Sequence, residues 1–450
     1  MDLLGKPFLE GLFRAAVAAA EPGAMVRKAL RRSASGLSLT AGGVSSGLDL
    51  DDLRKIYLVG GGKATRAMGE AAMRILGERV AAGVLAVPRG SGGGKGPVRF
   101  VEAGHPLPDE GSRRAAGEML SLLSEAGEDD LAIALISGGG SAMISAPAEG
   151  ITPADKEVVL SLLLRLGVNI AEFNTIRKHL SLVKGGRMAK AAHPARVWAL
   201  LLSDVPGDDP SVIASGPFSP DPTTYAEAQK ILIERRIWPD IPRAVRTHIE
   251  SGVGGRLPET PKRGDSIFGK VTCAVVGSNR IALNAVKAAA EREGAAVARI
   301  LPGFLRGEAR ECARAFVSEL RAASTSVPAG QVVVLAAGGE MTVTVRGRGK
   351  GGRNQEFALA AAIELDGAEG VAVLSAGTDG VDGPTDAAGA YVRGDTCARA
   401  RAAGLVPGHH LAGNDSHPLF RGLSDLVTTG PTGTNVTDVA IGVAVGTRRP

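Results

Sequence analysis

The stretch Leu131–Met143, LAIALISGGGSAM, decides the fold class of this 450-residue chain. Six consecutive apolar residues precede Ser137, three glycines and Ser141. A strand that is apolar at every position is typical of a sheet covered by helices on both faces, because neither face meets water. Glycines directly after such a strand are where α/β folds place ligand-binding loops. The stretch therefore predicts a buried parallel strand with a binding loop at its carboxyl end.

The alternation of short apolar strands and longer helical stretches continues on both sides of this segment. Further strands are expected at 55–59, 83–87, 197–202, 271–276, 296–301, 331–336 and 371–375, and helices at 64–79, 112–126, 156–165, 280–293, 308–323 and 356–365. This order favours mostly parallel, doubly wound sheets. Met341–Arg346, MTVTVR, alternates as a half-exposed strand does, and we expect an antiparallel hairpin with 331–336.

The length suggests two or three domains. The best boundary is Ser251–Asp265, SGVGGRLPETPKRGD, which is rich in Gly, Pro and charge and lacks apolar periodicity. We therefore predict a Rossmann-like, doubly wound, mostly parallel domain over 1–255 and a second, mixed α/β domain over 266–450.

Composition excludes several classes of function. The net charge is only +5, basic and acidic residues are mixed, and aromatics make up 3%, so nucleic acid is not an expected partner. The three cysteines form no CxxC pair, which argues against a zinc site or a disulfide framework. No apolar run is long enough for a membrane span, and LFRAAVAAA near the N-terminus is predicted to be an amphipathic helix. A cytoplasmic protein is expected, as a monomer or a homodimer.

Two glycine loops are predicted to bind an anion. In LVGGGKA a strand ends, Gly61 and Gly62 follow, and Lys63 opens a helix whose N-terminus favours negative charge. The second loop supplies Ser137, Gly138, Gly139, Gly140 and Ser141. Neither loop has the GxGxxG or GxxxxGK(S/T) spacing, so no cofactor can be named from them, and a plain tight turn remains the alternative.

Two further segments carry charge. Phe173–Lys190, FNTIRKHLSLVKGGRMAK, has five basic residues, for which a solvated face is the expected outcome and phosphate binding the alternative. Asp204 follows the apolar strand WALLL, at the strand end where open α/β sheets place active groups. We therefore expect a functional carboxylate at Asp204.

The strongest local signal is the basic, glycine-rich stretch Ala336–Ala362. Arg353 lies within it, and Asn354, Gln355 and Glu356 then open an Ala-rich helix. The forked guanidinium of arginine matches carboxylate or phosphate oxygens. Farther along, the Asp-rich loop Leu374–Tyr391 offers oxygen ligands for Mg²⁺ beside a nucleotide phosphate, although turn chemistry explains its composition equally well. Its candidates are Thr378 as a binding residue and Asp379 and Asp382 as metal ligands.

Taken together, these motifs resemble the class II glycerate 2-kinase family, whose members end in a MOFRL domain. The matching segments are GGGKA, GHPLPDEGS, SGGGSA, NTIRKHLS, SDVPGD, SGP, GGRNQE and GTDGVDGPTDAAGA, in this order along nearly the whole chain. The resemblance implies ATP-dependent phosphorylation of D-glycerate to 2-phosphoglycerate with Mg²⁺. It also implies a MOFRL-type domain over 266–450, an active site in the cleft between the two domains, and functional roles for Lys63, Asp204 and Arg353.

Two alternatives remain. An NAD(P)H-dependent hydroxypyruvate reductase would need a dinucleotide fingerprint, which LVGGGKA lacks. A non-catalytic sugar-acid-binding protein on the same scaffold is the other, because a fold does not by itself determine function. All three charged residues that the resemblance marks are present, which favours an enzyme.

Overall fold

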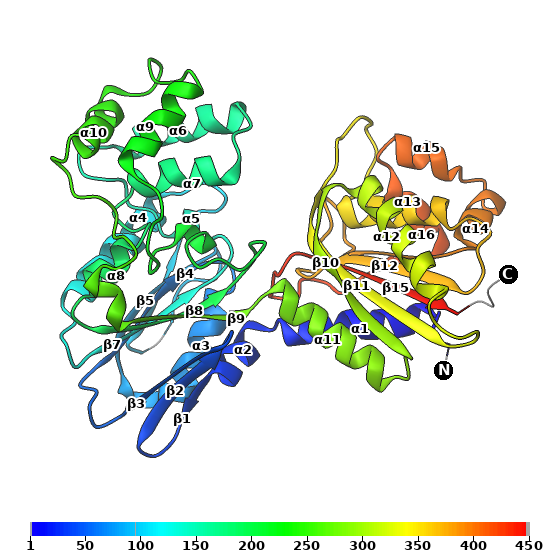
Figure 1. Ribbon diagram of the computed structural model, residues 1–450, viewed down its shortest axis with the longest axis horizontal. Coiled ribbons are helices and arrows are strands. Elements are labelled where there is room, and N and C mark those ends of the chain that lie inside the picture. Colours follow the sequence, from blue (N-terminus) through cyan, green and yellow to red (C-terminus); the bar gives the residue numbers. More distant parts are fainter. Residues whose placement is uncertain (1, 95, 447–450) are drawn as a thin grey trace. The chain divides into compact units, whose positions relative to one another are not determined.

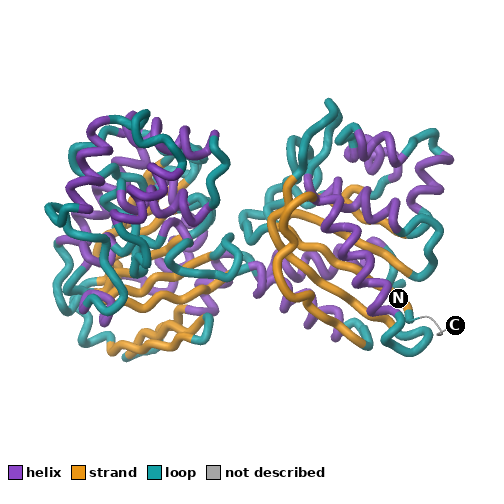
Figure 2. The backbone as a smooth tube through the Cα atoms, turned by 45° about the horizontal axis from the view of Figure 1, so that its top comes forward, coloured by secondary structure: helices purple, strands orange, loops and turns teal. Residues whose placement is uncertain are grey.

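The computed structural model describes residues 2–94 and 96–446, and the chain divides into two compact units (Figure 1). The central unit comprises Pro22–Val276. The terminal unit combines both ends of the chain, Met1–Glu21 and Gly277–Pro450. Each unit has its own sheet with helices packed on it, as the tube view also shows (Figure 2).

The central unit is built on a sheet with the strand order β6-β5-β4-β7-β8-β9. These strands are β4 (Ile56–Gly61), β5 (Val80–Val87), β6 (Val98–Glu102), β7 (Leu131–Ile136), β8 (Arg196–Leu202) and β9 (Val271–Gly277). The pairs from β6 to β8 are parallel. Every residue of β4 and of β7 is buried, as the unbroken apolar runs predicted. The predicted parallel, doubly wound sheet is confirmed.

The helices of the central unit cover this sheet and extend beyond it. They are α2 (Pro22–Ala29), α3 (Thr65–Leu76), α4 (Glu110–Ser124), α5 (Gly140–Met143), α6 (Pro153–Arg165), α7 (Ile170–His179), α8 (Arg187–Ala192), α9 (Tyr225–Glu234) and α10 (Arg243–Val253). A small antiparallel sheet that we had not predicted is formed by β1 (Leu30–Arg32), β2 (Gly36–Ala41) and β3 (Val44–Asp49). Helices α6, α7, α9 and α10 form a group of their own around a separate apolar core (Figure 1).

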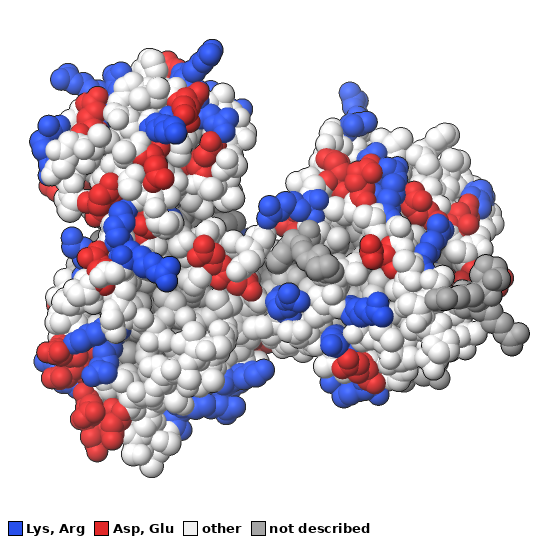
Figure 3. Space-filling view, viewed as in Figure 1, with Lys and Arg blue, Asp and Glu red and all other residues white. Residues whose placement is uncertain are grey.

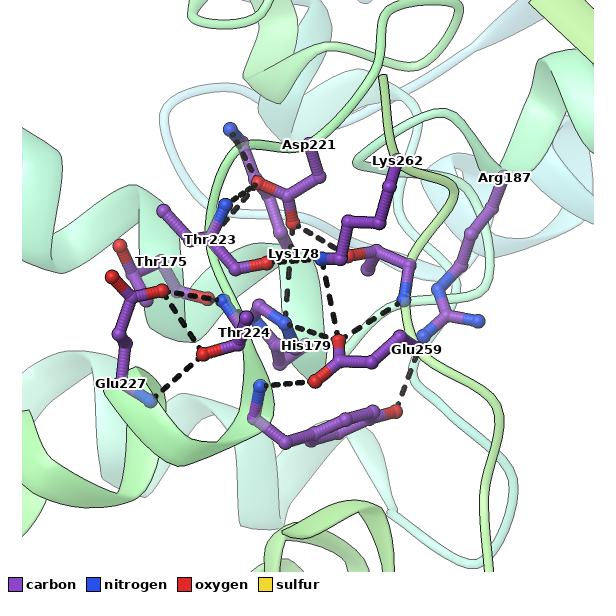
Figure 4. A network of polar contacts seen from close by, with 12 residues as sticks. Thr175, Lys178, His179, Arg187, Asp221, Thr223, Thr224, Glu227, Glu259 and Lys262 are labelled. Atoms are coloured by element: carbon purple, nitrogen blue, oxygen red, sulfur yellow. Dashed lines mark hydrogen bonds and ion pairs between the residues drawn. The ribbon is translucent and has the colours of Figure 1, made fainter. Parts of the chain in front are cut away.

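A buried polar network joins this helical group to the segment that follows it (Figure 4). Lys178 Nζ lies 3.2 Å from Asp221 Oδ1, and Thr260 Oγ1 donates to Asp221 Oδ2 at 2.9 Å. His179 contacts Glu259 through Nε2 at 3.3 Å. Lys178 and Asp221 are both buried, so the solvated basic face expected for 173–190 is wrong at Lys178. The carboxylate of Asp221 neutralises the ammonium group of Lys178, which would otherwise be a buried charge without a partner.

We expect Asp221→Asn to lower the free energy of unfolding by about 3 kcal/mol, because it leaves Lys178 buried without a counter-charge. Urea unfolding of the variant measures this loss. Asp240→Asn is the control, since Asp240 is exposed in the same unit and its replacement should change stability little. Equal stability of the two variants would contradict the role given to Asp221.

The terminal unit contains a mixed sheet with the order β10-β11-β15-β12-β13-β14. Its strands are β10 (Val297–Glu308), β11 (Val332–Thr342), β12 (Val371–Gly377), β13 (Gly389–Arg393), β14 (Leu426–Val427) and β15 (Asp438–Val445). Its helices are α1 (Lys6–Ala19), α11 (Asn279–Arg292), α12 (Ala309–Ser324), α13 (Arg353–Glu364), α14 (Thr396–Ala402), α15 (Pro407–Ala412) and α16 (Ser416–Leu423). Strand β11 is parallel to β10 and antiparallel to β15, so the predicted mixed α/β architecture is confirmed.

Two details of the terminal unit differ from the sequence-based expectations. The hairpin predicted at Met341–Arg346 is wrong: β11 runs straight on to Thr342, and its antiparallel partner is β15. The first helix is amphipathic as predicted, burying Phe8, Leu12 and other apolar residues, but it packs against α11 in the terminal unit. The division of the structure falls after Glu21 and after Val276, whereas the linker expected at 251–265 lies inside the central unit.

The surface mixes charges of both signs. Figure 3 shows Lys and Arg interspersed with Asp and Glu on the visible face of each unit, without a patch of one sign. The absence of a nucleic-acid partner stays a prediction. No helix in the described part of the chain is long and apolar enough to cross a membrane.

Candidate active site

The two glycine loops of the central unit are joined at the carboxyl edge of the sheet. Strands β4 and β7 are parallel neighbours, so the loops that follow them meet. The backbone N–H of Lys63 donates to the carbonyl of Gly138 at 2.9 Å. The N–H of Ala64 donates to Ser137 Oγ at 3.1 Å, at the start of α3. Ser137 therefore fixes the N-terminus of a helix that follows directly on Lys63.

Asp204 lies against the second loop. A Cβ atom placed on Gly138 would lie 2.3 Å from Asp204 Oδ2, so only glycine allows the carboxylate to sit there. A Cβ atom on Gly139 would lie 3.3 Å from Lys63 Cγ and 3.0 Å from His105 Cδ2. Lys63, Asp204 and His105 therefore surround the same two glycines. The sequence predicted the first two of these three residues as functional.

A pocket of about 620 Å³ opens beside Lys63. It is lined by Lys63, Pro88, Arg89, Ala103, Gly104, His105, Pro106, Leu107 and Met143. Burial, and then the charge of Lys63, lower the pKa of His105, which favours the neutral imidazole near pH 7. A pocket with one ammonium group, one guanidinium group and a neutral imidazole suits a small anion.

The remaining residues of the glycine loops shape the backbone. Gly62 has φ +141, and a Cβ there would lie 2.2 Å from Ser137 Oγ. Gly61 and Gly140 also face neighbouring atoms too closely to carry a side chain. Ser141 Oγ lies 2.7 Å from Ser215 Oγ, which ties the second loop to the segment after β8. The tight-turn alternative thus describes only part of these loops, because the turns also hold Lys63 and Asp204 in place.

Arg353 belongs to the terminal unit, where it is the first residue of α13. Its Nε lies 2.7 Å from Asp438 Oδ2, and its Nη1 lies 3.0 Å from Glu340 Oε1. Asp438 is buried at the start of β15, whereas Arg353 keeps a third of its side chain exposed. The two carboxylates orient the guanidinium and, among the described residues, leave its other N–H groups for a ligand.

The three residues after Arg353 turn inward and hold the loops of the terminal unit together. Asn354 Nδ2 donates to Asp438 Oδ1 at 2.9 Å and to Asp382 Oδ1 at 3.2 Å. Gln355 donates to Asp382 Oδ2 through its backbone N–H at 2.9 Å and through its side chain at 3.0 Å. Glu356 is buried and pairs with Arg310 at 2.6 Å. Their direct contact with a ligand stays a prediction, since each already has protein partners.

Most candidates in the Asp-rich loop Leu374–Tyr391, which is predicted to bind Mg²⁺, already form hydrogen bonds within the protein. Asp382 accepts the backbone N–H groups of Asn354 and Gln355, the arrangement of a helix cap at the start of α13. Asp379 accepts a single N–H, from Val381 at 3.1 Å. Thr378 is buried and donates to the carbonyl of Thr437 at 2.6 Å. In the described residues, no group of three or more His, Cys, Asp or Glu side chains is placed to hold a metal ion.

Burial, together with the neighbouring Asp382, raises the pKa of Asp438 to about 6, although Arg353 and Asn354 oppose this shift. The folded chain therefore holds a proton on Asp438 between about pH 4 and 6, where the unfolded chain has released it. The stability that this proton uptake adds is fully present below the pKa of Asp438 in the unfolded chain. It is lost as the pH rises through about 6, the pKa of Asp438 in the folded chain.

We expect the free energy of unfolding of the wild type, relative to Asp438→Asn, to rise by about 2 kcal/mol as the pH falls from 7 to 4.5. Asparagine has no proton to take up, so the variant isolates this one group. Urea unfolding of both proteins across this range measures the difference. A difference that stays constant or shrinks toward low pH would contradict the raised pKa of Asp438.

The structure places three residues next to Lys63 or Arg353 that the sequence did not single out: His105, Glu340 and Asp438. His105 has no metal-binding or catalytic spacing to another histidine that would single it out in the sequence. Glu340 and Asp438, the partners of Arg353, carry no motif of their own. An acid directly before the apolar strand VAIGVAV was the available signal for Asp438. Pairing of β11 with β15 brings these acids together, and pairing of distant strands cannot be predicted from local pattern.

Comparisons with known proteins agree along the chain. Residues 8–250 match a family described as "Domain of unknown function (DUF4147)", and residues 333–438 match the MOFRL family. A "D-glycerate 2-kinase" of Thermotoga maritima is 41% identical over 398 residues, which cover 88% of this chain and 92% of that protein. A "Putative hydroxypyruvate reductase" of Agrobacterium vitis is 40% identical over 441 residues, covering 97% and 94%.

Solved structures share the whole fold. A crystal structure of a Pyrococcus horikoshii protein matches with a TM-score of 0.87 and 37% identity, covering 99% of both chains. The crystal structure of a glycerate kinase from Thermotoga maritima matches with a TM-score of 0.84 and 36% identity, covering 97% of this chain and 98% of that one.

Proposed function

Because this chain belongs to the class II glycerate 2-kinase family, we propose that it transfers the γ-phosphoryl group of ATP to the 2-hydroxyl of D-glycerate. The products are 2-phosphoglycerate and ADP. One observation supports this proposal above the others: the Asp204 carboxylate lies against Gly138 and Lys63 lies against the adjacent Gly139, at the carboxyl edge of a parallel sheet. Open α/β sheets bind their ligands at this edge.

In the proposed reaction Asp204 accepts the proton of the 2-hydroxyl. The oxygen then attacks the γ-phosphorus, and the bond from that phosphorus to the bridging oxygen of ADP breaks. Phosphoryl transfer depends on positioning and on neutralisation of charge, with little covalent help from the protein. Lys63 supplies positive charge beside the glycine loops, whose backbone N–H groups suit phosphate oxygens. Ser137, Gly138, Gly139, Gly140 and Ser141 are the proposed binding loop.

Arg353 supplies the second positive charge, from the terminal unit. We propose that it contacts the anionic oxygens of the substrates, with Asp438 and Glu340 fixing its orientation. A guanidinium that is held by two carboxylates and still partly exposed is organised before the ligand arrives, which lowers the entropy cost of binding.

We propose that Mg²⁺ binds with few protein ligands, because phosphates and waters complete its coordination shell in nucleotide sites. Of the two candidate ligands, Asp379 has the more open carboxylate, since Asp382 already caps α13. When bound, the ion would neutralise charge on the phosphates.

Two assays separate this function from the alternative that one relative's name suggests. D-glycerate should drive the consumption of ATP, with ³¹P NMR showing the phosphate on carbon 2. Hydroxypyruvate should not drive oxidation of NADH, because the loop after β4 lacks a dinucleotide fingerprint. NADH oxidation without ATP turnover would overturn the proposal, and turnover to the 3-phosphate would correct its product.

Replacement of Gly138 tests the contact with Asp204. We expect Gly138→Ala to lower kcat by about 10- to 100-fold, because the new Cβ displaces the carboxylate from the reacting hydroxyl. Stability should change little, since the displaced atom is the end of a side chain. Gly117→Ala is the matched control, because Gly117 is exposed on α4 and a Cβ there meets nothing within 4 Å. A wild-type kcat in Gly138→Ala would show that the contact between Gly138 and Asp204 is not needed for the reaction.

A further inference from the structure

Three basic side chains lie together inside the central unit, apart from the residues proposed above for catalysis. Lys156 is on α6, Arg177 is on α7, and Lys184 lies in the segment after α7. Lys156 is 5% exposed and Lys184 only 1%, while Arg177 is partly exposed. We call this group the basic cluster. Long cationic side chains are rarely buried unless they are paired.

No carboxylate compensates the basic cluster. Among the described residues, no ion pair includes Lys156, Arg177 or Lys184, and the Lys156 Nζ and Arg177 Nε atoms are buried without a hydrogen-bond partner. Lys178, the next residue after Arg177, does have a carboxylate partner in Asp221. The same helix therefore carries one cation that the fold neutralises and one that it does not.

The three side chains are close enough to repel one another. Burial, and then Arg177, lower the pKa of Lys156 to about 7. Burial, Arg177 and Lys156 together lower the pKa of Lys184 far below its usual value. A bound anion would offset this unfavourable charge, as Asp221 does for Lys178.

Hydroxyl groups link the basic cluster to the second glycine loop. Lys184 Nζ donates to the carbonyls of Ser141 and Ile144 at 2.7 and 3.1 Å. Ser141 Oγ contacts Ser215 Oγ at 2.7 Å, and Ser215 Oγ donates to Asn174 Oδ1 at 3.1 Å. Asn174 is one helical turn before Arg177 on α7. The basic cluster thus borders the loop that we propose to bind the substrates.

The partly exposed member of the basic cluster is also held in place. The Arg177 guanidinium lies over the ring of Phe173, with its carbon 5.2 Å from the ring centroid. This contact restricts the guanidinium without using its hydrogen-bond donors. Arg177 is therefore the member of the basic cluster that reaches solvent.

We propose that Lys156, Arg177 and Lys184 bind the anionic oxygens of a small ligand, a phosphate or a carboxylate. The cation site itself follows from the burial of Lys156 and Lys184 and from the buried Lys156 Nζ and Arg177 Nε atoms, which have no hydrogen-bond partner among the described residues. The ligand's identity rests on the proposed function, which offers two sources: the carboxylate of D-glycerate or a phosphoryl group.

Calorimetric titration of Lys156→Met with inorganic phosphate, and separately with D-glycerate, tests this inference. Methionine keeps the length and apolar stem of lysine and removes the charge. We expect affinity for at least one of the two ligands to fall about tenfold or more, as for loss of one charge-assisted hydrogen bond. Lys190→Met is the matched control, because Lys190 is exposed in the same part of the chain and should bind as the wild type does.

Urea unfolding of the same variants shows whether a loss of affinity comes from a loss of the folded state. Since Lys156 has no partner, its replacement by Met should leave the urea midpoint unchanged or raise it. A lost phosphate affinity assigns the site to a phosphoryl group, and a lost glycerate affinity assigns it to the carboxylate. Unchanged affinity for both ligands, binding of neither by the wild type, or a strongly lowered midpoint would each overturn the inference.

The outcomes also distinguish this inference from the proposed function. If the wild type does not consume ATP with glycerate, but Lys156→Met loses phosphate binding, the anion-site inference stands and the kinase proposal is rejected. If the wild type consumes ATP with glycerate, but Lys156→Met binds both ligands as the wild type does, the kinase proposal stands and the anion-site inference is rejected.

Discussion

Asp204→Asn is expected to lower kcat by about 10²- to 10⁴-fold, the range associated with loss of a general base. Asparagine occupies almost the same volume, so the contact with Gly138 is preserved, but its amide cannot accept the proton of the 2-hydroxyl. The affinity for ATP should change little, because the proposed nucleotide contacts come from the glycine loops. Steady-state kinetics with D-glycerate and direct titration with ATP measure the two effects.

The control for this variant is Asp209→Asn in the same loop. Asp209 is exposed, and its Oδ1 accepts the N–H of Ser211 at 2.8 Å, a contact that asparagine retains. It should have wild-type kinetics. An Asp204→Asn enzyme that turns over as fast as this control would falsify the assignment of Asp204 as the base.

Arg353→Met is expected to lower kcat/KM by about 10²-fold or more, because it removes a preorganised charge from the transferring phosphoryl group or the glycerate carboxylate. The same change should destabilise the fold by about 2 kcal/mol, since Asp438 is left buried without its partner. The loss is less than that expected for a fully buried pair because Arg353 is 33% exposed. Kinetics and urea unfolding report the two losses separately.

A second substitution separates the structural role of Arg353 from its role in catalysis. Asp438→Asn, added to Arg353→Met, removes the unpaired carboxylate and should restore most of the lost stability. It should not restore kcat/KM, because the missing charge acts on the substrate. Recovery of both in the double variant would mean that Arg353 only supports the fold.

Strands β4, β5, β7 and β8 were predictable because each one is a largely apolar run. Leu131–Ile136 occupies the predicted residues without a shift, since a fully buried parallel strand needs no alternation of side chains. The strand at 332–342 could not be delimited in the same way. Its end, MTVTVR, alternates as an exposed strand does, whereas in the structure β11 continues through two glycines to pair with β15. That pairing joins segments about a hundred residues apart, which no local window contains.

The position of Lys63 and Asp204 beside the glycine loops was predictable, because each of them follows a strand closely. The contacts that a side chain makes across the fold were not predictable. Asn354 and Glu356 are predicted ligand contacts, and the structure shows in addition that they hold neighbouring loops together. The basic segment around Arg177 read as a solvated face, because charge pattern alone does not reveal that α7 is covered by α9. Burial is a property of the assembled unit and not of the segment.

We propose that Lys63, Asp204 and Arg353 act on the same substrates. A crystal structure of the full chain with bound ADP, Mg²⁺ and D-glycerate decides whether they do. We expect all three side chains within contact distance of the bound ligands, with Asp204 on the 2-hydroxyl. Ligands bound next to Lys63 and Asp204 but far from Arg353, whose guanidinium then faces only Asp438 and Glu340, would contradict this proposal.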